Sequence, residues 1–288
     1  MFLCDQWKEY EVLDTGDGEK LERWKDVVLQ RPDPQVIWPK AKPDLWDRAD
    51  ARYTRSETGG GAWTFHRKLP ERWVMTLSDL KCYVRPTGFK HTGLFPEQAA
   101  NWAFMRGRIE AARAGERPVK VLNLFAYTGG ATLACAAAGA HVTHVDAARG
   151  MVQWARENRD LSGIPEDRTR LIVEDAKTFV QRELRRGNRY DGILMDPPSY
   201  GRGPNGEVWK LENELYGLVE LCAQALSDTP AFLLINGYTT GFAASVLGNV
   251  VLRCMAGRGT VVAEELALPV TSGGVLPCGA TARWTPDA

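Results

Sequence analysis

The segment Asp196-Pro197-Pro198-Ser199-Tyr200 places a carboxylate, two prolines and an aromatic ring directly after a short apolar run. Proline has no N–H and a fixed φ, so the carbonyls of this turn can point outward as hydrogen-bond acceptors. With Asp196 they could hold an amino group or ring N–H, while Tyr200 offers a face for stacking a planar target. Such alignment suits transfer of a group to a neutral nitrogen, which needs no strong base. We therefore predict that Asp196, Pro197, Pro198 and Tyr200 are catalytic; an ordinary Pro-Pro loop is the alternative.

Two glycines lie where an earlier apolar run, 121–125, gives way to an Ala-rich segment. Gly129 and Gly130 have no Cβ, so the backbone can bend sharply there and approach a ligand closely. A dinucleotide site would favour the spacing G-x-G-x-x-G, whose helix start holds a pyrophosphate, and that spacing is absent. S-adenosylmethionine (SAM) has no pyrophosphate and fits this turn better. A tight strand–helix turn without a ligand is the alternative for this loop alone.

Two carboxylates follow the next two predicted strands. Asp146 lies seventeen positions beyond Gly129, where an acidic side chain can accept hydrogen bonds from both ribose hydroxyls. Asp175 lies two residues past the third strand, where it could accept from the adenine amino group. Each carboxylate alone is as often a helix cap. The glycine turn and these two carboxylates, however, follow three successive predicted strands. Together they predict a SAM site.

The segments that position these residues alternate between strand and helix patterns. The predicted strands cover 121–125, 141–145, 171–173, 192–195 and 231–235; the predicted helices cover 131–138, 151–158, 176–185 and 213–226, after a helical pattern that begins at Pro96. This order predicts an α/β fold with a Rossmann-like, doubly wound, mostly parallel sheet, and a ligand crevice at the carboxyl ends of its strands. We assign residues 91–288 to this domain.

The first ninety residues have a different pattern. Short β-prone pieces, separated by Asp-Gly, Pro and Gly turn signals, occur at 27–29, 35–38, 61–65 and 81–84. Six of the ten tryptophans fall in this part of the chain. We predict a small β-rich domain over residues 1–90 whose limited core depends on large aromatic side chains. Aromatic rings on sheets also stack nucleobases, so a role in substrate binding remains open beside simple core filling.

Composition limits the classes of function. The 288-residue chain has zero formal net charge, which argues against a polyanion-binding surface spread over the whole molecule. Between Lys81 and Lys120, eight Lys or Arg occur against three Glu, so a local phosphate contact and a solvated helix face both remain open. No apolar run has the length of a membrane span, and the start lacks a signal-peptide pattern. The six cysteines are scattered without metal-like spacing, so we expect a cytoplasmic protein without a metal.

Four runs, in order, resemble a known family: Thr92–Gln98, Asn123–Gly130, Val145-Asp146 and Met195–Ser199. They resemble bacterial ribosomal RNA methyltransferases of the large-subunit cytosine-5 type and their uncharacterised relatives, over about residues 80–240. The resemblance implies a class I SAM-dependent methyltransferase, and RNA as the substrate by analogy. It also implies that residues 92–98 close over the cofactor. The full predicted cofactor-binding set is Thr92, Gly93, Phe95, Gln98, Asn123, Phe125, Tyr127, Thr128, Gly129, Asp146, Asp175 and Asp196.

One departure from this family concerns the reaction. Cytosine-5 methylation needs a cysteine that adds to the ring, and in the family it follows the strand after the Pro-Pro motif. Residues 234–240 contain no cysteine, and Cys278 could serve only through a different geometry. We therefore predict methylation of a base nitrogen in RNA. The composition of residues 201–210, with Arg202, Trp209 and Lys210, suits a lid over the site; a plain surface loop is the alternative. A protein or small-molecule acceptor and a catalytically idle SAM- or RNA-binding scaffold remain alternatives, and an NAD enzyme is disfavoured.

Overall fold

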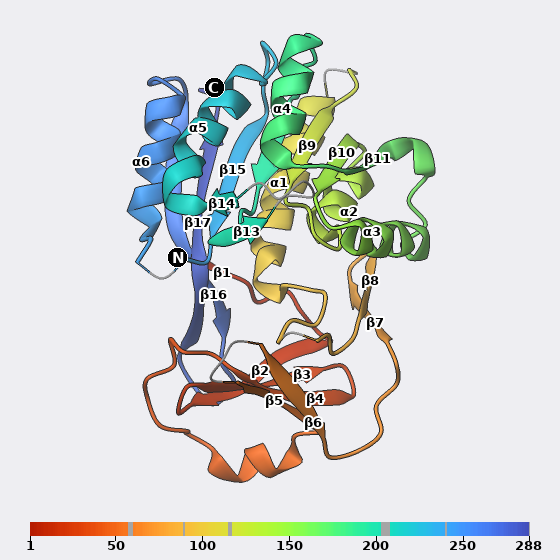
Figure 1. The fold of residues 1–288 in the computed structure, drawn as a ribbon, viewed down its shortest axis with the longest axis vertical. Coiled ribbons are helices and arrows are strands. Elements are labelled where there is room, and N and C mark those ends of the chain that lie inside the picture. The colour runs from red at the N-terminus through yellow and green to blue at the C-terminus, as the bar shows by residue number, and fades with distance from the viewer. Residues whose placement is uncertain (57–59, 89, 115–116, 203–207, 240, 288) are drawn as a thin grey trace. The chain divides into compact units, whose positions relative to one another are not determined.

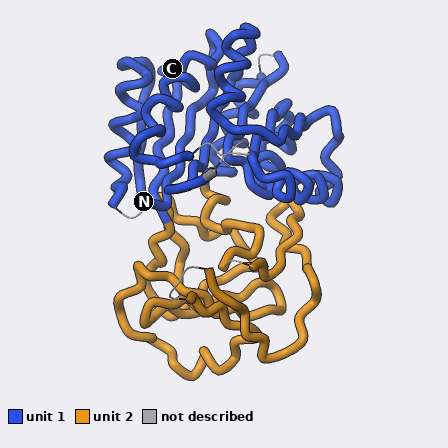
Figure 2. The backbone as a smooth tube through the Cα atoms, in the orientation of Figure 1, with its two compact units in different colours: residues 1, 101–265, 279–288 blue, residues 2–100, 266–278 orange. Residues whose placement is uncertain are grey.

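The computed structural model describes residues 1–56, 60–88, 90–114, 117–202, 208–239 and 241–287 (Figure 1). The chain divides into two compact units, coloured separately in Figure 2. The larger unit comprises residues 1, 101–265 and 279–288, and the smaller unit comprises residues 2–100 and 266–278. The predicted ranges 1–90 and 91–288 did not anticipate that a segment near the carboxyl end, 266–278, would belong with the amino-terminal residues.

The main sheet has eight strands in the order β1-β16-β17-β15-β12-β9-β10-β11. Neighbours from β15 through β12, β9 and β10 to β11 are parallel, and β17 runs antiparallel to β15. The predicted α/β fold with a mostly parallel sheet is therefore confirmed. The strands are β1 Phe2–Leu3, β9 Lys120–Leu124, β10 His141–Asp146, β11 Thr169–Val173, β12 Gly192–Met195, β15 Phe232–Gly237, β16 Thr260–Pro269 and β17 Val275–Thr285.

Helices cover both faces of this sheet (Figure 1). Alternate residues of its strands, such as Leu122 and Leu124 of β9, pack in one buried cluster with side chains of α4, α5 and α6. The helices α1, α2 and α3 cover the other face, where the Cys135 sulfur of α2 lies 3.9 Å from that of Met105 of α1. The sequence did not predict α6, β16 or β17. The helices are α1 Ala99–Arg113, α2 Gly130–Ala137, α3 Arg149–Leu161, α4 Ala176–Arg185, α5 Leu211–Gln224 and α6 Ala244–Cys254.

The central strands are apolar because both of their faces are covered. All four residues of β12 and all six of β15 are buried. A strand buried on both sides reads as a continuous apolar run rather than as an alternation of apolar and polar residues. This explains why the sequence revealed the central strands and their order so readily.

The smaller unit contains a five-stranded sheet in the order β2-β3-β4-β5-β6 and a separate hairpin, β7-β8. The β-prone pieces predicted at 27–29, 61–65 and 81–84 lie in β4, β6 and β8. The strands are β2 Tyr10–Gly16, β3 Glu19–Trp24, β4 Val27–Pro32, β5 Ala51–Arg55, β6 Gly61–Phe65, β7 Trp73–Leu77 and β8 Leu80–Val84.

The predicted β-prone piece 35–38 is wrong: these residues form a loop. Its carbonyls serve a neighbouring turn instead of a strand ladder. The N–H groups of Asp17 and Gly18 donate to the carbonyls of Trp38 and Val36, at 2.8 Å each. Both turn residues have positive φ, 54° and 77°, as the tight turn of a two-residue β-hairpin requires. The loop therefore stabilises the β2–β3 hairpin.

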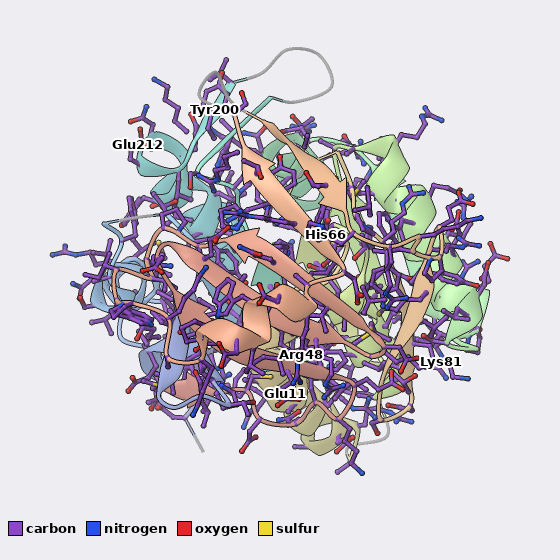
Figure 3. The ribbon with its side chains drawn as sticks, turned by 90° about the horizontal axis from the view of Figure 1, so that it is seen from below. Glu11, Arg48, His66, Lys81, Tyr200 and Glu212 are labelled. Carbon is purple, nitrogen blue, oxygen red and sulfur yellow. The ribbon has the colours of Figure 1, made fainter. Side chains whose placement is uncertain are left out.

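Tryptophans form part of the core of the smaller unit, as predicted. Trp24 is fully buried and Trp46 is 7% exposed, whereas Trp38 is 37% exposed. Trp46 belongs to the short helix η1, Pro43–Arg48, which packs on Leu21 and covers one face of the five-stranded sheet; Arg48 is labelled in Figure 3. Core filling thus accounts for two of these indoles.

Candidate active site

The order of the strands places a topological switch point in the larger unit. From β9 the chain continues to β10 and β11 on one side, whereas β12 and β15 lie on the other side. The loops that leave the carboxyl ends of β9 and β12 therefore diverge, and such a switch point is where ligands bind in open α/β sheets. The predicted residues 125–129, Asp146 and 196–199 all follow strand ends at this edge.

The turn after β9 requires its glycines. Gly129 has a φ of +88°, and a Cβ on it would lie 3.0 Å from the Cβ of Ala155. A Cβ on Gly130 would lie 2.6 Å from the ring of Trp102. Phe125 and Tyr127 also have positive φ, 55° and 51°, a conformation that L-residues seldom adopt outside constrained or functional sites. Packing within the larger unit thus requires glycine at both positions of this turn.

Buried polar side chains hold this turn in place through hydrogen bonds. Thr132 Oγ1 accepts from Asn123 Nδ2 at 2.9 Å and bonds to His144 Nδ1 at 2.9 Å. Asn158 Nδ2 donates to the carbonyl of Thr128 at 2.9 Å. Burial lowers the pKa of His144 to about 3, so its imidazole is neutral. Asn123 and Thr128 were predicted to bind the cofactor, and here they form part of the support beneath the turn.

The sequence analysis missed three members of this support: Thr132, His144 and Asn158. A signal for one of them was available. His144 lies two residues before Asp146 on β10, and alternate residues of a strand share a face. A polar residue at that position in a buried strand requires a partner. Thr132 and Asn158 lie on helices and gave no comparable signal.

Asp146 ends β10 with its carboxylate held by two main-chain groups. Its oxygens accept from the N–H groups of Tyr127 and Ala148, at 2.8 Å each. Burial raises the pKa of this carboxyl, while the two N–H donors oppose that shift. Each carboxylate oxygen has a second lone pair, so the side chain can still accept from the hydroxyls of a ribose. The predicted cofactor role is thus compatible with its fixed position.

Asp175 serves as a helix cap. It precedes α4, and its carboxylate accepts from the N–H of Thr178 at 2.8 Å. This is the structural role that the sequence analysis held open for it. Contact with an adenine amino group remains a prediction, because the capping bond occupies only part of the carboxylate.

The Asp196–Ser199 turn is fixed to its neighbours. The N–H of Asp196 donates to the carbonyl of Leu124, at the end of β9, at 3.3 Å. The hydroxyl oxygens of Ser199 and Thr239 lie 2.6 Å apart, which ties this turn to the segment after β15. The carbonyl of Pro198 accepts from the indole N–H of Trp209 at 2.6 Å. One lone pair of this carbonyl is therefore used within the protein, and its role as an acceptor for the substrate stays a prediction.

Tyr200 and Trp209 flank the loop after this turn. Tyr200 begins β13, Tyr200–Arg202, which pairs with β14, Val208–Lys210, and its side chain is 53% exposed (Figure 3). Trp209 is 9% exposed, with its ring centroid 5.1 Å from that of Phe125. Trp209 therefore packs beneath the site rather than covering it. The predicted lid residues 203–207 lie outside the described residues.

Four predicted cofactor residues belong to the smaller unit, in the segment before α1. Thr92 is fully buried, and Gly93 has a φ of +93°. The ring of Phe95 lies 5.3 Å from the ring of His91, and the N–H of Gln98 donates to the carbonyl of Phe95 at 3.1 Å. The segment is therefore well ordered within its own unit. Its contact with a cofactor stays a prediction.

Three arginines of the basic stretch between Lys81 and Lys120 bond to other groups of the larger unit. In the larger unit, Arg108 Nε donates to the carbonyl of Ala231 at 3.0 Å, and Arg113 Nη1 donates to that of Ala138 at 3.0 Å. Arg117 forms an ion pair with Asp191 at 2.7 Å. These arginines thus stabilise the fold, and a phosphate contact by the stretch stays a prediction.

None of the cysteine thiols is activated. Burial raises the pKa of every one of the six: to about 11 for Cys4, to about 12 for Cys82 and Cys135, and upward also for Cys222, Cys254 and Cys278. The nucleophilic form of cysteine is the thiolate. Thiols with raised pKa values are poorly suited to attack a pyrimidine ring.

Neither a metal-binding cluster nor a membrane-spanning helix is present in the described part of the chain. No cluster of three or more His, Cys, Asp or Glu there is arranged to hold a metal ion. Among its helices, none is long and apolar enough to cross a membrane.

Comparisons with known proteins agree with this geometry. A family model described as S-adenosylmethionine-dependent methyltransferase matches residues 62–222. Ribosomal RNA large subunit methyltransferase K of Neisseria meningitidis is 32% identical over 194 residues, which are 64% of this chain and 53% of that protein. Ribosomal RNA large subunit methyltransferase K/L of Pseudomonas syringae is 29% identical over 67% of this chain and 25% of its own length. The chain thus spans between about half and a quarter of the length of these relatives.

Solved structures extend the comparison to the whole chain. The crystal structure of the SAM-dependent methyltransferase from Agrobacterium tumefaciens has a TM-score of 0.94 and 38% identity, covering 99% of this chain and 93% of that one. A protein crystallised in complex with SAH has a TM-score of 0.69 over 96% of this chain and 76% of its own. At 18% identity the second likeness shows the fold alone.

Proposed function

The chain belongs to the S-adenosylmethionine-dependent methyltransferase family, and from that membership we propose that it methylates a nitrogen of a base in RNA, with ribosomal RNA as the substrate class. The observation that carries this proposal is the position of the Asp196–Tyr200 turn. It follows β12, directly beside the β9 turn that contains Gly129. A target held by the first turn would lie next to a cofactor held by the second.

The residues of the larger unit fit SAM. The turn at Gly129 has a positive φ and packs against Ala155, so it needs glycine, and we propose that its backbone approaches the cofactor closely. Asp146 is fixed by two main-chain N–H donors with lone pairs still available for a ribose. When bound, SAM supplies a methyl group on a positively charged sulfur. The task of these side chains is to bind and orient the nucleoside part.

Asp196 and the Pro197 carbonyl are the acceptors proposed for the substrate. A carboxylate and a carbonyl accept hydrogen bonds and donate none, so together they select a target that presents N–H groups. Holding those N–H groups fixes the plane of the base and directs the nitrogen lone pair towards the methyl group. Alignment of this kind supplies most of what a displacement at a methyl carbon requires. We propose that Tyr200, whose side chain is 53% exposed, stacks on the ring of the base.

The state of the cysteines supports nitrogen rather than carbon 5 as the acceptor. Attack on a cytosine ring requires a thiolate, and burial raises the pKa of all six thiols. A base nitrogen needs no such nucleophile, since its own lone pair attacks the methyl carbon. The names of the two relatives above support RNA as the substrate class, by analogy.

The test is a comparison of methylated nucleosides in ribosomal RNA from cells with and without the gene, by mass spectrometry after complete digestion. We expect one N-methylated nucleoside to disappear on deletion, to return with the wild-type gene, and not to return with Asp196→Ala. Loss of a 5-methylcytidine would contradict the nitrogen assignment. An unchanged RNA profile would favour a protein or small-molecule acceptor, or an idle scaffold.

A further inference from the structure

One face of the five-stranded sheet in the smaller unit gathers cations and aromatic rings. Residues opposite one another in paired strands share a face, as do alternate residues along a strand. Lys20 of β3 pairs with Arg31 of β4. Leu29, also on β4, pairs with Ala51 of β5, which in turn pairs with Phe65 of β6. One face therefore runs continuously from β3 to β6. We call it the Trp63 face; it carries Lys20, Glu22, Arg31, Arg55, Trp63 and Phe65.

The Trp63 face contains a buried ion pair between Arg31 and Glu22. Arg31 donates from Nε and Nη2 to the two carboxylate oxygens of Glu22, at 2.6 and 2.8 Å. Their side chains are 7% and 0% exposed. Lys20 Nζ lies 3.4 Å from a carboxylate oxygen of Asp33. Each of these two cations therefore has a carboxylate partner, and their charges are largely balanced.

Two more cations lie beside these pairs. Burial and the positive charges of Lys20, Arg55 and Arg31, opposed by the carboxylate of Asp33, lower the pKa of Lys90 to about 8. Glu97 is a further carboxylate that acts on Arg31. An anion placed beside Lys90 and Arg55 would reduce the repulsion among these cations.

The segment that carries Lys90 is fastened to this face. Arg31 Nη1 donates to the carbonyl of Lys90 at 2.9 Å, and the indole N–H of Trp63 donates to that of Thr87 at 2.8 Å. Within the segment, Thr87 Oγ1 donates to the carbonyl of His91 at 2.8 Å. The main chain beside Lys90 is therefore held in place before any ligand arrives, which reduces the entropy lost on binding.

An exposed aromatic surface continues the same face. Phe65 is 52% exposed, and its ring is nearly parallel to that of Trp63, at 28° with centroids 6.3 Å apart. Trp63 is fixed by its bond to Thr87 and by an edge contact with Tyr53 at 5.4 Å. Packing within the unit does not explain why so large a ring remains in solvent at the end of β6, just before His66 (Figure 3).

We propose that the Trp63 face binds single-stranded RNA, with a base stacked on Phe65 and the phosphate of another nucleotide, about 13 Å further along the paired strands, held by Arg55 and Lys90. Aromatic rings together with cations along one surface are the combination by which proteins hold unpaired nucleotides. An acidic peptide would use the cations but not the ring, and a duplex would offer no free base to stack. The inference rests on the proposed RNA substrate, and it gives the smaller unit the task of capturing that substrate.

The experiment measures binding of the full chain to a fluorescein-labelled oligoadenylate of about ten nucleotides, by anisotropy at several salt concentrations. Phe65→Ala should weaken binding by roughly 5- to 100-fold at every salt concentration, because a stacking contact is lost. Arg55→Ala and Lys90→Ala should each weaken binding at low salt, and each should lower the slope of log K against log salt by about 1.

Two matched controls lie outside the Trp63 face. Arg52→Ala removes a cation from the same strand as Arg55 but from the opposite face, where it pairs with Glu19 at 3.1 Å. Tyr216→Ala removes a ring of similar exposure, 47%, from α5 in the larger unit. Both should bind the oligonucleotide within about twofold of wild type. Circular dichroism and SAM affinity establish that every variant is folded.

The outcomes separate this inference from the proposed function. If wild type methylates RNA but folded Phe65, Arg55 and Lys90 variants bind the oligonucleotide like wild type, the Trp63 face is not the RNA surface and the proposed function stands. Equal affinity for a duplex of the same length would also overturn the inference. If wild type neither binds nor methylates RNA, the proposed function itself fails, and an acidic protein partner becomes the better interpretation of this face.

Discussion

The two units of this methyltransferase position their functional residues in different ways. In the larger unit, Asp146 and Asp196 each follow a parallel strand, and strand order alone brings them to one edge of the sheet. In the smaller unit, Lys20, Arg31 and Phe65 share a face only through the register of the four paired strands β3 to β6. A site built on strand ends can be recognised from local sequence, whereas one built on strand register needs the fold.

The largest effect that we expect concerns the buried charges of the smaller unit. Glu22→Gln should lower the free energy of unfolding by about 3–5 kcal/mol, because Arg31 then remains buried without its counter-charge. Urea denaturation followed by tryptophan fluorescence measures this loss. The exposed pair of Arg52 and Glu19 supplies the control, since Arg52→Ala should cost less than about 1 kcal/mol. Equal losses of unfolding free energy in the two variants would show that the buried ion pair contributes no more to stability than the pair of Arg52 and Glu19.

The same ion pair predicts a pH dependence. Burial alone would raise the pKa of Glu22, but the charges of Arg31 and Lys20 outweigh burial and lower it to about 2. A carboxyl whose folded pKa is depressed contributes stability above its unfolded pKa and loses it as the pH falls through the folded value. The stability difference between wild type and Glu22→Gln should therefore shrink between about pH 4.5 and pH 2. A stability difference that stays constant over this pH range would contradict a lowered pKa of Glu22 in the folded protein.

The next effect concerns the cofactor side of the larger unit. Asp146→Ala should weaken SAM binding by about 1.5–3 kcal/mol, because hydrogen bonds to a charged acceptor are lost. Isothermal calorimetry gives this value directly. Asp175→Ala is the comparison: if Asp175 serves chiefly as a cap, its loss should affect the stability of α4 more than SAM affinity. Unchanged affinity in a folded Asp146 variant would exclude this residue from the site.

A smaller effect concerns the packing beneath the β9 turn. Gly130→Ala should lower the free energy of unfolding by about 1–3 kcal/mol, because its Cβ would lie 2.6 Å from the Trp102 ring. Gly217→Ala in α5 is the matched control, since nothing lies within 4 Å of its Cβ. That change should stabilise the protein by up to about 1 kcal/mol. Thermal unfolding of both variants checks the sign of each effect.

The smallest effect should follow Cys278→Ser. Burial raises the pKa of this thiol well above its ordinary value, so we expect it to pack rather than to react. Turnover should stay within about threefold of wild type. A serine variant that binds SAM but does not methylate would restore the cytosine-5 reaction with Cys278 as its nucleophile. Covalent trapping of wild type by RNA containing 5-fluorocytosine would support the same reversal.

The sequence predicted most of the larger unit because its signals are local. Strands buried on both faces, such as β12, read as continuous apolar runs, and Gly129 and Gly130 mark the turn after β9. The burial of Trp209 was not predictable, because the partners of its ring and N–H, Phe125 and Pro198, lie elsewhere in the chain. The Thr132–His144 bond was hidden for the same reason.

The smaller unit was less predictable because its contacts depend on strand register, which the sequence does not specify residue by residue. The sequence revealed β4, β6 and β8, and it suggested aromatic packing. It misassigned 35–38, whose carbonyls serve the β2–β3 turn. The buried pair of Glu22 and Arg31 requires the antiparallel register of β3 and β4. The segment 266–278 joins this unit from the other end of the chain, which no local pattern could indicate.

The central claim is that the two strand-end carboxylates of the larger unit divide the work, with Asp146 binding the cofactor and Asp196 aligning the acceptor. The most direct test compares single-turnover methylation of RNA and SAM affinity in Asp196→Ala. We predict a fall in rate of about 100-fold or more, as expected for lost alignment, with SAM affinity within about threefold of wild type. A variant whose SAM affinity falls as far as its rate, or whose rate is unchanged, would contradict this division of roles.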